Sequence, residues 1–247
     1  MTILDDELTE VAALVLDVDD TIIDTRGAMV AAGTAAAAAV WPDADEHVAM
    51  AQRYHADPGR WFRRYASGEL AFEQMRAERL REVADVFGLP LGEDTFDRYE
   101  AAYGPAFRRS QRLFDDVPDL LDAAEAVGLP VALLTNSAHE PTRVKLEALD
   151  LHERFEVVVT TDTLGFGKPD ERVYLEVCAR VGVAPARAVC VGDSLEWDVL
   201  GARSAGLQAV WLDREGRGTG EAVASVTSLG ELAAAVRRRF GPPRMDR

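Results

Sequence analysis

A run of apolar residues that ends in carboxylates constrains this chain more than any other feature. The run begins near Val11, and Asp17, Asp19 and Asp20 occupy three of the positions 17–20. An uninterrupted run of this kind predicts a strand buried on both faces of a sheet, with the acids where the chain leaves the sheet. Residues two apart on a strand project from the same side, so Asp17 and Asp19 are expected to lie close together.

Two carboxylates held side by side repel each other. At ~4 Å, the repulsion is ~4 kcal/mol when the effective dielectric constant is about 20. A bound cation would offset this cost, so the stretch 14–21 is typical of a metal site with a carboxylate nucleophile. An acidic loop that follows a core strand is the competing interpretation, and this stretch alone favours neither.

More apolar runs recur in the second half of the chain, separated by helical patterns. They predict strands at 131–135, 157–160, 188–192 and 208–212. Helices are expected at 118–127, from 137 onward, and at 169–181, 195–204 and 228–240. Strands that alternate with helices and are apolar on both faces indicate an α/β protein with a parallel sheet covered by helices.

The segment from Arg26 to Arg112 has a different character. It is rich in Ala, Arg and Glu, and it carries helical periodicity without a convincing strand pattern. One apolar stripe runs from Leu70 to Phe87 and ends at Gly88, a residue that commonly follows a helix. We therefore expect four or five helices here, with aromatic residues used for packing.

Charge and composition exclude several partners. With a net charge of −16, the protein surface would be repelled by nucleic acid or by an anionic membrane, so neither is expected as a partner. An anionic substrate must then be attracted by a local cation or lysine. No apolar run approaches the ~18 residues of a membrane span, and no secretion signal is evident, so a cytoplasmic location is expected. Cys178 and Cys190 stand in apolar contexts and are expected to be buried thiols.

Polar residues suited to phosphate chemistry follow the predicted strands. Thr135 ends the second predicted strand, and Asn136 comes directly after it. Asp193 follows the fourth strand, with Asp198 further on, and Lys168 precedes a helix between the third and fourth strands. Ligands of open parallel sheets bind beyond the carboxyl ends of the strands, so these residues are expected to converge.

Each residue type has a chemical role around a phosphate. Asp17 can act as a nucleophile, and Asp19 can protonate a leaving oxygen and then deprotonate water. Asp193 offers an oxygen to Mg²⁺, a hard ion that binds few carboxylates together with substrate phosphate, and Asp198 leans toward the same ion. Lys168 offsets negative charge. Singly, each could be an ordinary turn or surface residue, but the ordered set favours a functional site.

The ordered set resembles the four motifs of the haloacid dehalogenase superfamily of hydrolases. The matching stretches are Asp17-Val18-Asp19-Asp20-Thr21, Thr135-Asn136, Lys168-Pro169 and Gly192-Asp193-Ser194 with Asp198. The resemblance implies a Rossmann-like catalytic core at residues 1–24 and 113–247 with strand order 5-4-1-2-3. It also implies a helical cap domain at residues 25–112.

The resemblance further implies a role for each motif residue. Asp17 would be the nucleophile, and Asp19 the acid/base and a metal ligand through its carbonyl. The residues expected to bind phosphate are Asp20, Thr21, Thr135, Asn136 and Lys168; Thr135 and Lys168 are also counted as catalytic. The residues expected to hold Mg²⁺ are Asp17, Asp19, Asp193 and Asp198. Asp20 stands where many family members have Gly, which adds an acid near the site.

The expected function is a Mg²⁺-dependent phosphatase that hydrolyses a small phosphorylated metabolite through an aspartyl-phosphate. A sugar phosphomutase shares the motifs and is an alternative. A 2-haloacid dehalogenase is a weaker alternative, because those enzymes generally lack an acid at the position of Asp19 and in the fourth motif. Phosphonate hydrolysis would call for a cap lysine, and residues 26–112 contain none. A regulatory domain that binds metal or phosphate without turnover is the alternative from another class.

Overall fold

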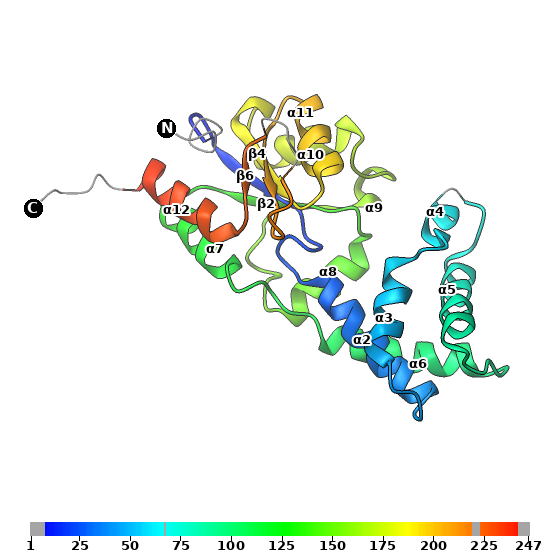
Figure 1. The fold of residues 1–247 in the computed structure, drawn as a ribbon. Coiled ribbons are helices and arrows are strands. Elements are labelled where there is room, and N and C mark those ends of the chain that lie inside the picture. Colours follow the sequence, from blue (N-terminus) through cyan, green and yellow to red (C-terminus); the bar gives the residue numbers. More distant parts are fainter. Residues whose placement is uncertain (1–7, 67, 219–222, 242–247) are drawn as a thin grey trace, which may run out of the picture. The chain divides into compact units, whose positions relative to one another are not determined.

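The computed structural model describes residues 8–66, 68–218 and 223–241. The chain divides into two compact units, which Figure 1 shows coloured along the sequence. The core unit consists of Met1–Asp24 and Leu113–Arg247, and it contains the sheet. The helical unit is Thr25–Arg112, and its described residues form helices and no strand.

The described residues of the core unit form a six-stranded sheet in which neighbouring strands are parallel. The order is β3-β2-β1-β4-β5-β6, so β1 lies between β2 and β4. Leu14 of β1 pairs with Val131 on one side and with Val189 on the other. The strands are β1 (Ala13–Leu16), β2 (Val131–Leu134), β3 (Val158–Val159), β4 (Ala188–Gly192), β5 (Gln208–Leu212) and β6 (Ser225–Val226).

The predicted α/β fold with a Rossmann-like parallel sheet is confirmed. The predicted strand order 5-4-1-2-3 holds for the first five strands along the chain, and β6 extends the sheet beyond β5. The sequence does not predict β6, because a strand of Ser225 and Val226 is too short to leave an apolar run.

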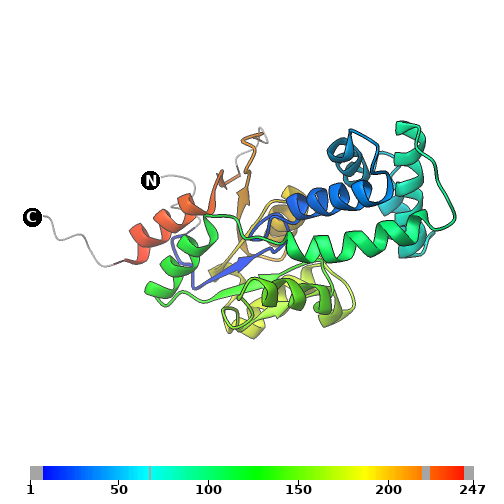
Figure 2. The ribbon, with the colours of Figure 1, turned by 90° about the horizontal axis from the view of Figure 1, so that it is seen from below.

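Apolar side chains cover both faces of the sheet. Leu14 and Leu16 of β1 pack in one cluster with α7 (Val117–Ala126) and α12 (Leu229–Phe240), two helices that lie against each other in Figure 2. Val15 belongs to a second cluster, on the opposite face, which includes α10 (Glu171–Val181). Neighbouring positions of β1 are thus buried on opposite faces, which explains why the run in the sequence is uninterrupted.

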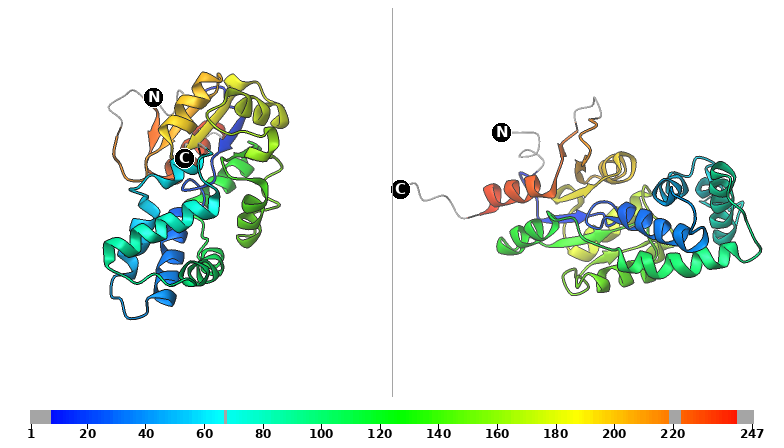
Figure 3. Two further views of the ribbon diagram at one scale, coloured as in Figure 1. Left: turned by 90° about the vertical axis from the view of Figure 1, so that its right-hand side faces the viewer. Right: turned by 60° about the horizontal axis from the view of Figure 1, so that its bottom comes forward.

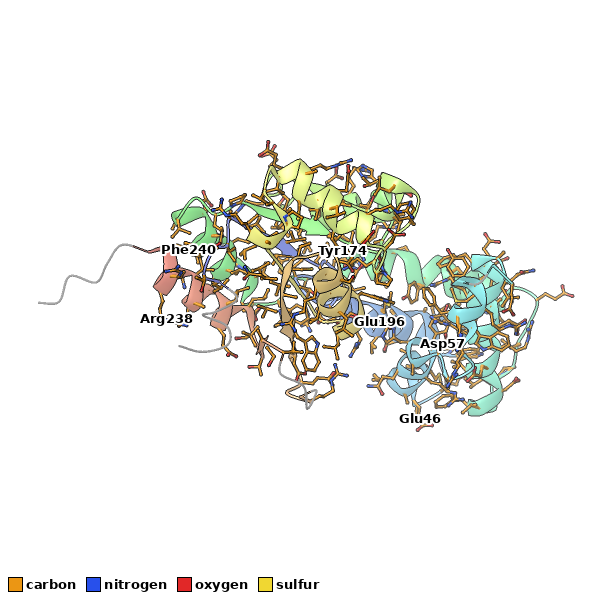
Figure 4. All side chains as sticks on the ribbon, turned by 90° about the horizontal axis from the view of Figure 1, so that it is seen from above. Glu46, Asp57, Tyr174, Glu196, Arg238 and Phe240 are labelled. Carbon is orange, nitrogen blue, oxygen red and sulfur yellow. The ribbon has the colours of Figure 1, made fainter. Side chains whose placement is uncertain are left out.

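Short helical segments connect the remaining strands. They are α8 (His139–Ala148), α9 (Thr161–Leu164), the 3₁₀ turn η1 (Pro185–Arg187), the π-helical segment η2 (Leu195–Gly201) and α11 (Ala202–Ser204). Tyr174, labelled in Figure 4, is buried and donates its hydroxyl hydrogen to the Trp197 carbonyl of η2. A Cβ on Gly201 would lie 2.2 Å from the Tyr174 hydroxyl, so a glycine is needed there. The predicted helix 195–204 is present but begins as a π-helix, a form often found at functional sites.

The helical unit packs around small and aromatic side chains, and Figure 3 shows it in two views. Its helices are α2 (Thr25–Val40), α3 (His47–Ala56), α4 (Trp61–Ala66), α5 (Phe72–Phe87) and α6 (Thr95–Arg109). α2 packs against both α3 and α6. A Cβ on Gly33 would lie 2.9 Å from the Ala51 Cβ, so the glycine permits a close approach of α2 and α3.

The two ends of the helical insert leave the core unit side by side. Ile23 and Leu113 form an antiparallel bridge, and the Phe114 amide donates to the Ile22 carbonyl at 3.1 Å. The insert is therefore attached through two adjacent segments that come directly after the acidic motif and directly before α7.

Two further expectations concern the thiols and the membrane. Cys178 and Cys190 are buried free thiols, as the sequence predicts. Among the described residues, the structure contains no helix with the length and apolar character that a membrane crossing requires.

Candidate active site

The predicted site residues of the core unit follow the carboxyl ends of its central strands. Asp17 follows β1, Thr135 follows β2, and Asp193 follows β4. Because β1 pairs with both β2 and β4, these three positions share one edge of the sheet. This edge is where open parallel sheets bind their ligands.

Lys168 connects two of the carboxylates. Its Nζ lies 2.7 Å from Asp17 Oδ1 and 2.6 Å from Asp198 Oδ1, and its side chain is 2% exposed. The Asn136 amide fixes the backbone of this lysine: Asn136 Oδ1 accepts from the Lys168 amide at 2.6 Å, and Asn136 Nδ2 donates to the Lys168 carbonyl at 2.9 Å. Asn136 thus holds Lys168 in place, a role that the sequence does not predict; its contact with phosphate stays a prediction.

Three carboxylates gather beside this lysine. One oxygen each from Asp17, Asp193 and Asp198 lie within 4.8 Å of one another. Asp198 Oδ2 also accepts from the Ser194 amide at 3.0 Å, and a Cβ on Gly192 would lie 2.2 Å from Asp198 Cγ. The buried Asp198 carboxylate therefore depends on a glycine at the end of β4.

Thr21 links the first motif to the fourth. Its Oγ1 donates to Asp17 Oδ2 at 3.0 Å and accepts from the Asp193 amide at 3.2 Å. Both oxygens of Asp17 are therefore held, one by Lys168 and one by Thr21. The binding of phosphate by Thr21, expected from the sequence, stays a prediction.

Three more predicted residues border this group. The buried Thr135 accepts from the Ser137 amide at 3.0 Å through its hydroxyl oxygen, so the hydroxyl hydrogen can still be donated elsewhere. Asp20 has a φ of 60°, a conformation that aspartate tolerates in turns, and its amide donates to the Ile23 carbonyl at 2.8 Å. Asp19 is partly exposed, and its Oδ1 accepts a hydrogen bond from Nζ of Lys145.

Lys145 is the residue that the sequence analysis missed. It lies on α8, and its partner Asp19 is 126 positions away along the chain. One signal in the sequence could have found it: Lys145 and Lys168 are the only lysines among the 27 Lys and Arg residues of the chain.

Burial and neighbouring charges shift the pKa values of Asp17 and Lys168 in opposite directions. Burial raises the pKa of Asp17 to about 7, although the Lys168 charge acts to lower it. Burial alone would lower the pKa of Lys168, but the charges of Asp17 and Asp198 outweigh burial and raise it. Lys168 therefore stays protonated, and its one positive charge is shared by two carboxylates, those of Asp17 and Asp198.

This excess of negative charge fits a divalent cation. The donors in the cluster of Asp17, Asp193 and Asp198 are all carboxylate oxygens, the ligand type that hard ions such as Mg²⁺ prefer. Two of these carboxylates are buried and one is partly exposed, so an ion bound by all three would be reachable from solvent. A buried aspartate cluster of this kind could bind a metal.

Comparisons with known proteins identify the family of the chain. A family model described as haloacid dehalogenase-like hydrolase matches residues 11–206. A phosphoglycolate phosphatase from Thiobacillus denitrificans is 30% identical over 196 residues, which cover 79% of this chain and 80% of that protein. A phosphoserine phosphatase from Thermus thermophilus is 37% identical over 139 residues, which cover 56% of this chain and 48% of that protein. The chain thus matches about half the length of the second relative.

The solved structures share the fold. The structure of an L-2-haloacid dehalogenase from Xanthobacter autotrophicus aligns with a TM-score of 0.66 and 23% identity, over 92% of this chain and 98% of that chain. At this identity the likeness concerns the fold alone. The family model, in contrast, covers most of the sequence, including all four motifs. The chain belongs to the haloacid dehalogenase-like hydrolase family.

Proposed function

We propose that this protein is a Mg²⁺-dependent phosphatase that hydrolyses a small phosphomonoester through an aspartyl-phosphate on Asp17. One observation carries the proposal: Lys168 bonds to Asp17 and Asp198, and a third carboxylate, that of Asp193, completes a cluster within 4.8 Å. A nucleophile, a fixed positive charge and a set of hard-ion ligands thus share one sheet edge. The names of the two relatives, a phosphoglycolate phosphatase and a phosphoserine phosphatase, support a small phosphorylated metabolite as substrate.

In the first step, a carboxylate oxygen of Asp17 attacks phosphorus. The bond from phosphorus to the ester oxygen breaks, and that oxygen takes a proton from Asp19. In the second step, Asp19 removes a proton from water, and the water oxygen attacks the same phosphorus. The bond to Asp17 then breaks, and inorganic phosphate leaves. One acid/base thus serves both steps, and the enzyme returns to its starting state.

The other residues would orient the Asp17 carboxylate and stabilise the charge on the transferred phosphoryl group. The hydrogen bonds from Lys168 and Thr21 fix the two oxygens of Asp17, so the nucleophile is held in one orientation. Lys168 and the hydroxyl of Thr135 would stabilise the charge on the transferred group. A Mg²⁺ ion held by Asp17, Asp193, Asp198 and the Asp19 carbonyl would neutralise negative charge on the phosphoryl oxygens.

The helical unit would act as a cap over the substrate. It is inserted a few residues after Asp17 and Asp19, and its two connections run side by side at Ile23 and Leu113. Such paired connections suit a hinge, and closure would exclude bulk water during the transfer of the phosphoryl group to Asp17. The absence of lysine in residues 26–112 still argues against phosphonate hydrolysis.

Dehalogenation and a non-catalytic role are less well supported. The likeness to a dehalogenase structure concerns the fold alone. The cluster of three carboxylates, together with Asp19 as a separate acid/base, suits metal-assisted phosphoryl transfer. A module that merely binds phosphate would not need a nucleophile held at both oxygens. Neither nucleic acid nor a membrane is part of the proposal, and the cytoplasmic location stays a prediction.

A phosphate-release assay tests the proposal. The purified chain is incubated with a panel of phosphomonoesters that includes phosphoglycolate, phosphoserine and sugar phosphates, with Mg²⁺ or with EDTA. We expect release that requires Mg²⁺ and a covalent phosphoryl-protein adduct detectable by mass spectrometry after acid quench. Chloride release from 2-chloropropionate without phosphate release would favour the dehalogenase. Phosphate binding without turnover of any ester would favour the regulatory domain.

A further inference from the structure

We propose that Lys145 is a positioning residue that holds the Asp19 carboxylate in place for proton transfer. The inference rests on the proposed function, because it assigns a partner to the acid/base of that reaction. The structure supplies the contact: Lys145 Nζ donates to Asp19 Oδ1, and the lysine side chain is 9% exposed, against 32% for Asp19. Lysine is among the residues least often buried, so this one has a specific use.

The orientation of α8 directs Lys145 inward. Thr142, Lys145 and Leu146 are the buried residues of this helix, and Leu146 belongs to the apolar cluster under the sheet. Arg143, on the same helix, is exposed and pairs with Glu140 and Glu147 on the surface. The helix thus separates a surface cation from a buried one. The buried one reaches the loop after β1.

The choice of lysine is itself informative. Of the 27 Lys and Arg residues, the lysines are Lys145 and Lys168, and both bond to an acid of the first motif. Every other permanent cation of the chain is arginine. An ammonium is a compact point charge, whereas a guanidinium is a wide planar fork. The chain therefore has lysine at the two buried positions where a compact ammonium contacts an acid of the first motif, Asp17 for Lys168 and Asp19 for Lys145.

A tether on Asp19 has a mechanical purpose. Asp19 lies in the loop that follows β1, next to Asp20 with its φ of 60°. An acid/base must stand within hydrogen-bond reach of the oxygen that it protonates, and small misplacements are costly. A cation fixed on a packed helix restricts the rotation of the carboxylate. Lys145 touches Asp19 and need not touch the substrate, which makes it a positioning residue.

The test separates positioning from a merely structural role by the leaving group. An alkyl phosphate such as β-glycerophosphate needs a proton on its leaving oxygen, whereas p-nitrophenyl phosphate releases a stable phenolate without one. We expect Lys145→Met to lower kcat/KM for β-glycerophosphate by about 10- to 100-fold and for p-nitrophenyl phosphate by less than about 3-fold. Lys145→Arg should recover part of the loss. Arg143→Met, on the exposed face of the same helix, should match the wild type with both esters.

A double-mutant cycle with Asp19→Asn keeps the test decisive. In the Asp19→Asn background, Lys145→Met should cause no further loss with the alkyl ester, because the two residues act as a unit. An equal loss with both esters, or a loss that persists without Asp19, would overturn the inference. If Lys145→Met fails to fold, the same comparison is made with Lys145→Gln and Lys145→Arg.

The outcomes distinguish this inference from the function on which it rests. A wild-type protein that hydrolyses neither these two esters nor any ester of the panel in the presence of Mg²⁺ refutes the phosphatase. A wild-type protein that is active, with Lys145→Met indistinguishable from Arg143→Met, leaves the phosphatase intact and refutes the positioning role alone.

Discussion

Charged side chains are buried in the core unit and partly buried in the helical unit, and the two units balance these charges differently. In the core unit, Lys168 pairs with two carboxylates, those of Asp17 and Asp198, so negative charge is in excess. In the helical unit, Arg76 pairs with Glu100, and Arg79 pairs with Asp57, the latter labelled in Figure 4. Each of these arginines has one carboxylate.

The difference separates the candidate active site from a structural ion pair. The Arg76 guanidinium also lies 4.5 Å from the centroid of the Tyr103 ring, so its charge is satisfied on two sides. In the core site, by contrast, Asp17 and Asp198 share the one ammonium of Lys168, and the burial of Asp17 raises its pKa. Unbalanced buried charge of this kind is typical of functional sites. Such a site lowers the stability of the folded protein and in return binds a ligand or metal.

The largest effect should follow removal of the nucleophile. We expect Asp17→Asn to lower kcat by about 10⁴-fold or more, because an amide cannot form the aspartyl-phosphate. Steady-state phosphate release with the best ester of the panel measures the loss. The control is Asp122→Asn, an exposed aspartate of α7, which should retain full activity. Substantial activity in Asp17→Asn, with deamidation excluded by mass spectrometry, would assign the chemistry to another residue.

The next effect concerns the balanced pair of the helical unit. Arg76→Met should lower the free energy of unfolding by about 2–3 kcal/mol, because it leaves the Glu100 carboxylate partly buried without its partner. Urea unfolding measures the loss, and hydrogen exchange should localise it to Thr25–Arg112. Arg81→Met, at an exposed position of the same helix, should cost less than about 0.5 kcal/mol. Equal losses in the two variants would show that burial of the pair is irrelevant.

A smaller effect of opposite sign is expected in the core unit. The raised pKa of Asp17 means that the folded state binds more protons than the unfolded state between the ordinary value of 3.8 and about 7. Stability from this group is therefore present at low pH and is lost as pH rises through that window. In metal-free protein, the stability of Asp17→Asn relative to the wild type should therefore increase with pH, by about 1–2 kcal/mol between pH ~6 and pH ~8.

Added Mg²⁺ should narrow or reverse this difference. A ligand that binds the folded state stabilises it, and the wild type retains the full carboxylate set. Urea unfolding of both proteins, at two pH values and with Mg²⁺ or EDTA, gives the comparison. A stability of Asp17→Asn relative to the wild type that does not rise with pH without metal would contradict the excess of negative charge.

The sequence predicts the sheet well because burial on both faces leaves a strong signal. The continuous run before Asp17 and the runs at β2, β4 and β5 stand out without any knowledge of the partner strands. β6 leaves no such signal, because its position depends on pairing with β5 rather than on its own two residues. Local pattern predicts elements that bury many residues and misses those that depend on a neighbour.

For the candidate site, the sequence predicts which residues come together but not the contacts that hold them. The rule that ligands bind at the carboxyl ends of parallel strands brings Asp17, Thr135 and Asp193 together from strand positions alone. The contacts that hold these groups are specific to the folded chain: the Asn136 amide on Lys168, and Lys145 on Asp19. No spacing in the sequence encodes a contact between a helix and a loop 126 positions apart.

The smallest expected change in stability comes from adding a methyl group to a helix glycine, in the helical unit and, as a control, in the core unit. Gly33→Ala gains helix propensity of about 1 kcal/mol, but the new methyl group would stand 2.9 Å from the Ala51 Cβ, which cannot rotate away. Overpacking of this kind costs about 1–3 kcal/mol, so a net loss of about 0.5–1 kcal/mol is expected.

Gly230→Ala, in α12 of the core unit, is the matched control. Its Cβ would meet the Ser228 hydroxyl at an ordinary 3.6 Å, so the propensity term should dominate and raise stability by a few tenths of a kcal/mol, about 0.3. Urea unfolding of both variants measures the two signs. A gain in both would mean that α2 and α3 separate without cost, and the close approach at Gly33 would then contribute nothing to the stability of the helical unit.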